Sequence, residues 1–170
     1  MKPLYRFAAV ALLVLGLFAW WYYQPKRILE RKLDDLIADL SFDPGTTRSS
    51  RLIKSSSIGG YFDRQVEITS PIDEANGNFS PEDLNSGFSF LSENAREISI
   101  QRAEKLTTTI DGKHATMEFD ADVKVSISRW LKGLNGRYAV IVHWRKTEHG
   151  WKIHSSSCLL PHNSSTPKGS

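Results

Sequence analysis

The stretch Thr116–Ile127 reads TMEFDADVKVSI and has the most regular pattern in the 170-residue chain. Its apolar residues are Met117, Phe119, Ala121, Val123, Val125 and Ile127, and the polar residues between them are Thr116, Glu118, Asp120, Asp122, Lys124 and Ser126. Because successive side chains of a β-strand point to opposite faces, this alternation predicts one long strand with a buried face and a solvated face. Such a strand is typical of an antiparallel sheet that is covered on one side only.

Strand patterns continue on both sides of this stretch. The residues that mark them are Ile98, Ile100 and Ile110 before it, Tyr138, Val140, Val142, Trp144, Trp151 and Ile153 after it, and Phe62, Val66 and Ile68 further upstream. Asp111-Gly112 is a hairpin signal, and Glu148-His149-Gly150 turns the chain into the last strand. The second half of the chain is therefore predicted to be an antiparallel meander.

Three helices are expected before this meander. Residues 26–41 carry a stripe of leucines at helical spacing, namely Leu29, Leu33, Leu36 and Leu40. A weaker helical segment covers residues 47–57, and Ser80 is placed to cap a helix that starts at Pro81 with Asp83 in its first turn. Helices followed by strands predict an α+β fold in which the helices pack on one face of a curved antiparallel sheet.

The N-terminal run from Phe7 to Tyr23 contains no charged residue in 17 positions. A helix of this length spans about 25 Å, near the lower limit for crossing a bilayer. The run lacks the pair of small residues that a signal-peptidase site needs, so an uncleaved signal anchor is expected. The anchor residues that we single out are Phe7, Leu12, Leu13, Leu15 and the aromatic belt Trp20, Trp21, Tyr22 and Tyr23.

The expected organisation is a short N-terminal region (1–6), a transmembrane anchor (7–24), one folded domain (26–158) and a polar, disordered tail (159–170). A count of basic residues near the anchor favours a cytoplasmic domain, since Lys26, Arg27, Arg31 and Lys32 follow the run. A short basic stretch followed at once by an apolar run is, however, the layout of an export signal. We expect a single-pass protein of a bacterial inner membrane with a periplasmic domain.

Charge and cysteine content exclude several classes of protein. Lys2 and Arg6 precede the apolar run, and the remainder carries 20 basic and 19 acidic residues, so no nucleic-acid surface is expected. Cys158 is the single cysteine, which excludes an intramolecular disulfide and a multi-cysteine metal site. We interpret Cys158 as a small buried hydrophobe.

The chain resembles the nuclear-transport-factor-2-like (NTF2-like, SnoaL-like) superfamily. The resemblance rests on the first amphipathic helix, on IGGYFDRQVEI at 58–68 and on RYAVIVHWRKTEHGWKIHSSS at 137–157, and it covers residues 26–158. Cystatin-like proteins, which usually have fewer helices, are the second-ranked resemblance. Membership would imply a cone-shaped domain with a cavity between sheet and helices, and frequent dimers through the open sheet face. The cavity of such proteins holds a catalytic site, binds a small molecule or is simply filled.

The residues give little support to catalysis or to metal binding. Isomerases of the superfamily take a tyrosine from the first helix, and residues 26–41 contain no Tyr or His; Asp34, Asp35 and Asp39 lie off the leucine stripe and are expected to be solvated. His143, His149 and His154 lie on or between neighbouring strands, but His149 is in a turn and no carboxylate stands at a matching position. We predict no catalytic set, no metal and no cofactor.

Five residues are candidates for lining a ligand pocket: Met117, Phe119, Tyr138, Trp144 and Trp151. Filling of the core is their ordinary role, and a pocket for an apolar ligand is the alternative. Two functions stay open: a membrane-anchored, non-enzymatic module that binds a partner or forms a homodimer through the sheet face, and a small-molecule-binding or isomerase- or dehydratase-like member that uses the cone. We favour the first.

Overall fold

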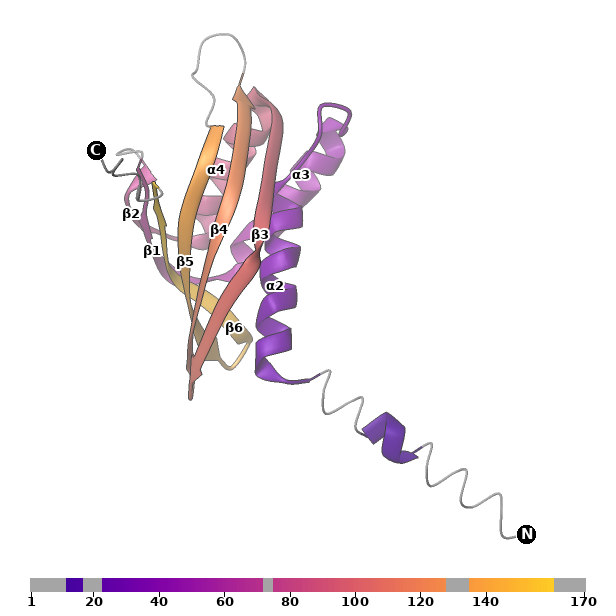
Figure 1. Ribbon diagram of the computed structural model, residues 1–170. Coiled ribbons are helices and arrows are strands. Elements are labelled where there is room, and N and C mark those ends of the chain that lie inside the picture. Colours follow the sequence, from indigo (N-terminus) through magenta and orange to yellow (C-terminus); the bar gives the residue numbers. More distant parts are fainter. Residues whose placement is uncertain (1–11, 17–22, 72–74, 128–134, 161–170) are drawn as a thin grey trace, which may run out of the picture. The chain divides into compact units, whose positions relative to one another are not determined.

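The computed structural model describes residues 12–16, 23–71, 75–127 and 135–160 (Figure 1). Its elements in chain order are α2 (Pro25–Leu40), α3 (Arg48–Ser57), the 3-10 helix η1 (Ile58–Tyr61), β1 (Phe62–Thr69), β2 (Gly77–Phe79), α4 (Pro81–Asn94), β3 (Ala95–Asp111), β4 (His114–Ile127), β5 (Asn135–Thr147) and β6 (Gly150–Leu159). The chain divides into two compact units, Met1–Asp34 and Asp35–Ser170, with the boundary inside α2.

Six strands form one sheet in the order β2-β1-β6-β5-β4-β3. The meander β3–β6 is antiparallel, as the alternating pattern predicts, and the predicted turn at Asp111-Gly112 joins β3 to β4, with Gly112 at a φ of +56°. Strand β1 pairs with β6 in parallel, which differs from the expected all-antiparallel sheet. The short strand β2 lies in the region after Pro71 and pairs with β1.

The ladder partners of β4 define a buried face of the sheet. Three rows of paired residues run across β3, β4, β5 and β6 on this face: Ile110, Ala115, Trp144 and Ile153; Thr108, Met117, Val142 and Ser156; Leu106, Phe119, Val140 and Cys158. Met117 and Trp144 are fully buried, and Phe119 is 8% exposed. The polar residues that alternate with them on β4, such as Glu118 and Asp120, are exposed, so the predicted phase of the strand is confirmed.

Helices α3 and α4 lie together on one side of the sheet (Figure 1), and α4 packs against β1, β2 and β3. The predicted capping box starts α4: the Ser80 hydroxyl accepts from the Asp83 N–H at 3.2 Å, and the Asp83 carboxylate accepts from the Ser80 N–H at 2.9 Å. Gly59 permits a close approach to α4, because a Cβ at this position would lie 2.9 Å from the Pro81 carbonyl oxygen.

Arg51 on α3 joins three segments at the other end of the helix pair. Its guanidinium donates to the Thr46 carbonyl at 3.1 Å and to the Ala95 carbonyl, at the start of β3, at 2.9 Å. The same group lies 4.2 Å from the centre of the buried Phe42 ring. One cation therefore satisfies main-chain carbonyls where two helices and a strand meet, which would otherwise leave acceptors unpaired.

Helix α2 has the predicted stripe, with Leu29, Leu33 and Leu36 buried. Its acidic residues divide differently from the expectation. Asp34 and Asp35 are exposed, but Asp39 is half-buried and accepts a hydrogen bond from the Tyr61 hydroxyl at 2.8 Å. This hydrogen bond links helix α2 to η1, which ends at Tyr61.

Most of the predicted anchor (7–24) lies outside the described residues. Residues 12–16 are helical, and their side chains, including Leu12, Leu13 and Leu15, are exposed. No helix within the described ranges is both long and apolar enough to cross a membrane. Phe7 and the belt residues Trp20, Trp21 and Tyr22 lie outside the description, as does the chain after Leu160, while Tyr23 is described and exposed.

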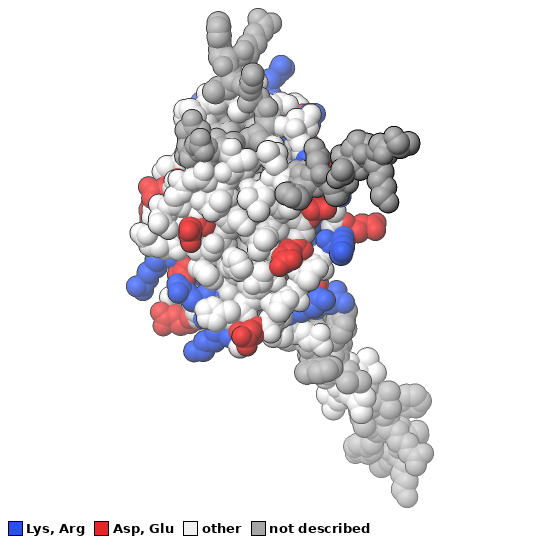
Figure 2. Space-filling view, turned by 60° about the vertical axis from the view of Figure 1, so that its left-hand side comes forward, with Lys and Arg blue, Asp and Glu red and all other residues white. Residues whose placement is uncertain are grey.

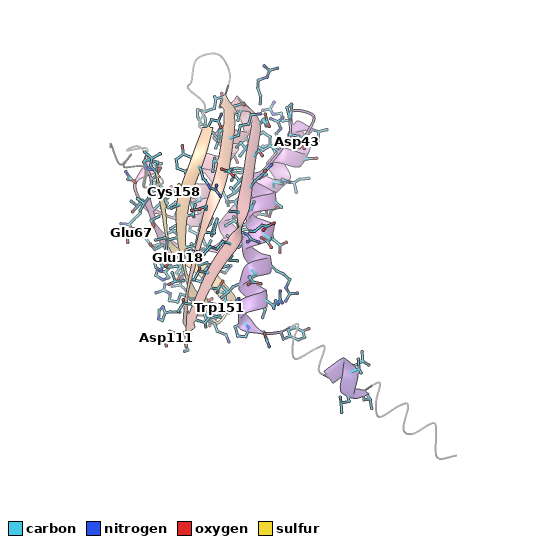
Figure 3. The ribbon with its side chains drawn as sticks, in the orientation of Figure 1. Asp43, Glu67, Asp111, Glu118, Trp151 and Cys158 are labelled. Atoms are coloured by element: carbon cyan, nitrogen blue, oxygen red, sulfur yellow. The ribbon has the colours of Figure 1, made fainter. Side chains whose placement is uncertain are left out.

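We predict that Met117→Ala lowers the free energy of unfolding by about 2–5 kcal/mol, because it removes a fully buried side chain and leaves a cavity. Urea unfolding followed by tryptophan fluorescence measures this. Glu67→Ala is the control: Glu67 is exposed on β1 and points outward in Figure 3. Its expected change is within about 0.5 kcal/mol. Equal changes for the two variants would contradict the packing described for β4.

Candidate functional site

The five residues predicted to line a pocket all belong to the core. Met117, Phe119, Tyr138, Trp144 and Trp151 are each 8% exposed or less. Phe119 also borders a surface hollow of about 290 Å³ formed on β3, β4 and β5. The other four side chains are buried in the core, so packing accounts for them without a ligand. Their role in ligand binding stays a prediction.

Two polar atoms on the buried face lack partners within the described part of the chain. The indole N–H of Trp144 and the hydroxyl of Thr108 are both buried without a hydrogen bond. Their rows are adjacent in the sheet, since Trp144 pairs with Ala115 and Thr108 pairs with Met117. A buried donor without an acceptor costs free energy, and native proteins usually satisfy such groups with protein, water or a ligand.

Cys158, predicted to be a buried hydrophobe, is half-buried in the structure. Figure 3 places it on β6, and burial raises the pKa of its thiol above the ordinary value. A thiol with a raised pKa has little thiolate at neutral pH and is a poor nucleophile. The geometry therefore gives no support to cysteine catalysis.

The opposite face of the sheet, which we call the open face, carries residues of moderate size. Two of its rows across β3–β6 are Thr107, Glu118, Ile141 and Ser157, and Thr109, Thr116, His143 and Ser155. Figure 2 shows one side of the molecule, on which acidic and basic side chains are scattered among uncharged ones. Ile141, Ala139 and the β6 serines are half-buried in the chain as described.

Three histidines from three strands meet at one end of the open face. The ring of His154 on β6 lies 6.1 Å from the ring of His143 on β5 and 6.2 Å from that of His114 on β4. A register shift leaves His154 unpaired in the ladder, between Ile153 and Ser155. Sequence reasoning chose His149 instead of His114. His114 lies two residues before Thr116, which pairs with His143, so the alternation along β4 is the signal that could have found it.

Charged groups beside this histidine cluster set its electrostatics. Burial lowers the pKa of His154, and the positive charge of Arg145 and the neighbouring His143 and His114 lower it further, against the opposing effect of Asp63. Asp63 accepts from Arg145 Nε at 2.9 Å and also from its Nη2. Partial burial works to raise the pKa of Asp63, but the hydrogen bonds from Arg145 and from the Arg64 N–H outweigh it and lower the pKa overall.

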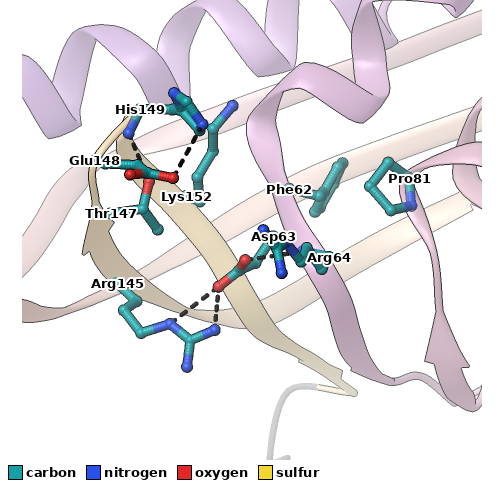
Figure 4. A pocket seen from close by; sticks show the side chains of 9 residues that line it. All are labelled: Phe62, Asp63, Arg64, Pro81, Arg145, Thr147, Glu148, His149 and Lys152. Atoms are coloured by element: carbon teal, nitrogen blue, oxygen red, sulfur yellow. Dashed lines mark hydrogen bonds and ion pairs between the residues drawn. The ribbon is translucent and has the colours of Figure 1, made fainter.

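A pocket of about 640 Å³ opens at the same end of the molecule (Figure 4). It is lined by Phe62, Asp63, Arg64, Pro81, Arg145, Thr147, Glu148, His149 and Lys152. Lys152 Nζ donates to the Gly60 carbonyl, and His149 pairs with Glu148 at 3.4 Å in the exposed turn. Within the described ranges, no group of three or more His, Cys, Asp or Glu side chains stands where it could hold a metal ion.

Comparison with solved structures identifies the fold. A candidate scytalone dehydratase from Novosphingobium aromaticivorans has a TM-score of 0.60 at 11% identity, over 78% of this chain and 81% of its own. An NTF2-like protein with a cystatin-like fold from the same species gives 0.52 and 14%, over 97% and 94%. A candidate calcium/calmodulin-dependent protein kinase II association domain from Xanthomonas campestris gives 0.56 and 14%, over 80% and 89%.

The predicted resemblance is therefore confirmed at the level of fold: the domain has the α+β NTF2-like architecture, with helices on a curved, mostly antiparallel sheet. Neither the protein-family models nor the curated protein sequences give a match. Identities this low show a shared fold, and a fold alone does not choose among functions.

We predict that the free energy of unfolding falls as the pH drops below 6.5, in part through His154. Because the folded state lowers the pKa of His154 below 6.5, the unfolded chain binds its proton first, and stability is lost as the pH falls. Urea unfolding between pH 7.5 and 5 should show a smaller loss for His154→Asn. His149→Asn, in the exposed turn, should keep the full loss. Identical pH profiles for the parent and His154→Asn would refute the role given to the cluster.

Proposed function

We propose that this chain is a membrane-tethered, non-enzymatic module of NTF2-like fold that pairs with a second copy of itself through the open face of its sheet. The observation that carries the proposal is the contrast between the two faces of β4. The side chains on one face are buried in a packed core, and those on the other are available and carry charges of both signs.

The core side supports a non-enzymatic role. The rows of paired residues on the buried face consist of apolar, hydroxyl and thiol side chains, with Met117, Trp144 and Ile153 at 1% exposure or less. No acid–base pair emerges among these rows. Of the described carboxylates of α2, Glu30 pairs with Lys26 and Arg27, Asp34 and Asp35 are exposed, and Asp39 accepts from Tyr61. General acid–base chemistry needs titratable groups within reach of a bound substrate, and these rows supply only the Cys158 thiol, whose pKa is raised.

The open face supports a second copy as the partner because its charges complement themselves. Acidic Glu118, Asp120 and Asp122 alternate with apolar residues along β4, while Arg137 and Arg145 lie on the adjacent β5, where Arg137 pairs with Asp120 and Arg145 with Asp63 of the same chain. In this arrangement a two-fold axis lies above the open face, parallel to the strands and midway between β4 and β5. The acidic strand of each copy then lies over the basic strand of the other. An isologous interface requires this self-complementarity.

Shape and precedent agree with pairing. The hollow on β3, β4 and β5 is lined by Thr107, Ala139 and Ile141 among others, and it offers a place for a side chain of a second copy. The same fold occurs in a candidate association domain as well as in a candidate dehydratase. Because one fold serves both kinds of protein, the fold alone does not choose between them. The difference between the two faces of this sheet is what favours association here.

The tether in this proposal is residues 7–24, with the domain in a bacterial periplasm. Its support is the charge-free run of 17 residues from Phe7 to Tyr23 and the exposed apolar side chains at 12–15. Exposed leucines without a protein partner favour a lipid environment. A short basic stretch before the run is the layout of an export signal.

A second function is favoured by the unpartnered Trp144 indole N–H and Thr108 hydroxyl. Both face the interior of the cone, so a small, largely apolar ligand with one polar group would satisfy them. This alternative is a ligand-binding member, or an isomerase- or dehydratase-like member, of the fold. It ranks second because the described core holds no catalytic set to act on such a ligand.

Native mass spectrometry of the full-length chain released from a neutral detergent separates the two functions. We expect a dimer without a small-molecule adduct, and at least tenfold weaker dimerisation for Ile141→Lys, which puts a long, charged side chain in the middle of the open face. Ile53→Lys is the matched control, because Ile53 is 71% exposed on α3. A monomer that carries a reproducible adduct would contradict self-association and support the second function.

For the tether, we predict that the parent chain stays in the membrane pellet after an alkaline carbonate wash and that Leu13→Arg shifts it to the supernatant. An arginine at the centre of a spanning helix costs about 2.5–3.5 kcal/mol. Ile53→Arg changes charge equally outside the run and should stay in the pellet. Release of the parent chain by carbonate would contradict the proposed membrane tether, and it would leave the test of dimerisation unaffected.

A further inference from the structure

Basic side chains converge on the pocket of Figure 4 from three strands. Arg64 comes from β1, Arg145 from β5 and Lys152 from β6, and all three line the same hollow. The acidic lining residues are Asp63 and Glu148. The fixed charges of the lining therefore leave a net positive balance, before any contribution from His149.

The existing contacts leave much of this positive charge uncompensated. Lys152 is held by a neutral main-chain carbonyl, that of Gly60, which fixes its position without cancelling its charge. Among the described residues, no carboxylate forms an ion pair with the Arg64 guanidinium. Glu148 is exposed in the turn and pairs with His149. Asp63 is the one acid in the lining that is engaged with a strand cation, Arg145.

The geometry favours a tetrahedral oxyanion over a carboxylate. A single guanidinium can satisfy a carboxylate, and Asp63 Oδ2 already accepts from both Nε and Nη2 of Arg145. A phosphate group carries more oxygens and a higher charge, so it can accept from several cations that arrive from different directions. Arg64, Lys152 and the remaining N–H of Arg145 meet that requirement.

We infer that this pocket binds a phosphate monoester of a small organic group. The phosphate would lie among Arg64, Arg145 and Lys152, with the Thr147 hydroxyl nearby as a further polar group of the lining. Phe62 and Pro81 form an apolar wall of the same pocket, which suits the organic part of the ester. A volume of about 640 Å³ exceeds the needs of inorganic phosphate and falls in the range of small-molecule sites.

This site shares Arg145 with the open face, and the rest of its lining lies outside the surfaces used by the two functions proposed above. It lies at the end of the sheet where β1, β5 and β6 meet the start of α4, and its lining contains none of the five core residues Met117, Phe119, Tyr138, Trp144 and Trp151. The ligand of the pocket can be a soluble phosphate ester or the headgroup of phosphatidic acid, since both carry a phosphate monoester. The two sources differ in whether the ligand is dissolved or held in a bilayer.

The test is a titration of the ¹⁵N-labelled full-length chain, followed by amide shifts, at constant ionic strength. In a neutral detergent the probe is phenyl phosphate and the neutral comparison is benzyl alcohol; in nanodiscs the probe is phosphatidic acid against phosphatidylcholine. We expect saturable shifts at Arg64, Thr147 and Lys152 with a phosphate probe. Arg64→Ala should weaken binding about tenfold, the usual effect of losing one charge-assisted hydrogen bond. Arg96→Ala, an exposed arginine outside the pocket, should leave it unchanged.

The outcomes decide the inference in either direction. Saturation by phenyl phosphate supports a soluble ester, and saturation by phosphatidic acid alone supports a lipid headgroup. No saturable shift at millimolar phenyl phosphate and none with phosphatidic acid would overturn the site. Equal weakening by Arg64→Ala and Arg96→Ala would also overturn it, because it would show that overall charge rather than the pocket holds the anion.

Discussion

The parallel pairing of β1 with β6 is the contact that joins the two halves of this fold. Strand β1 is formed early in the chain and β6 is formed last, yet they are neighbours in the sheet. Through β1, the sheet gains β2, η1 and the packing surface of α4. The ladder adds to the direct contacts that α4 makes with β3 and that η1 makes with β6. The Asp63–Arg145 pair reinforces it by linking β1 to β5 across the intervening β6.

The two faces of the same strands create two different electrostatic settings. On the buried face, charge is absent from the rows of β4 and its partners, and even the polar atoms of Trp144 and Thr108 lack hydrogen bonds. On the open face, burial and the nearby Arg145, His143 and His114 lower the pKa of His154, and the hydrogen bonds from Arg145 help to lower the pKa of Asp63. The three histidines and the Asp63–Arg145 pair therefore lie on the open face, at one end of the sheet.

Local pattern predicts the parts of this structure that depend on neighbouring residues. The phase of β4, the hairpin at Asp111-Gly112 and the capping box of Ser80 are set by nearby side chains, and each is confirmed. The parallel β1–β6 ladder and the histidine cluster depend on registers between distant segments and on a bulge at His154. Alternation does not report where a strand is placed in a sheet, so Arg64, Arg145 and Lys152 could not be recognised as one pocket beforehand.

Strand β3 lies at the edge of the sheet, and it is 17 residues long. Near its start, Ile98 of β3 exchanges main-chain hydrogen bonds with Phe42, which covers that part of the edge. An uncovered edge is a template on which further chains can add strands without limit. Here the register between β3 and β4 shifts between Arg102 and Leu106, where Glu104 and Lys105 are exposed. The bulge and its charges interrupt the edge. Growth into an open-ended fibre is thereby disfavoured, whereas the two-fold pairing that we propose for the open face would close after two copies.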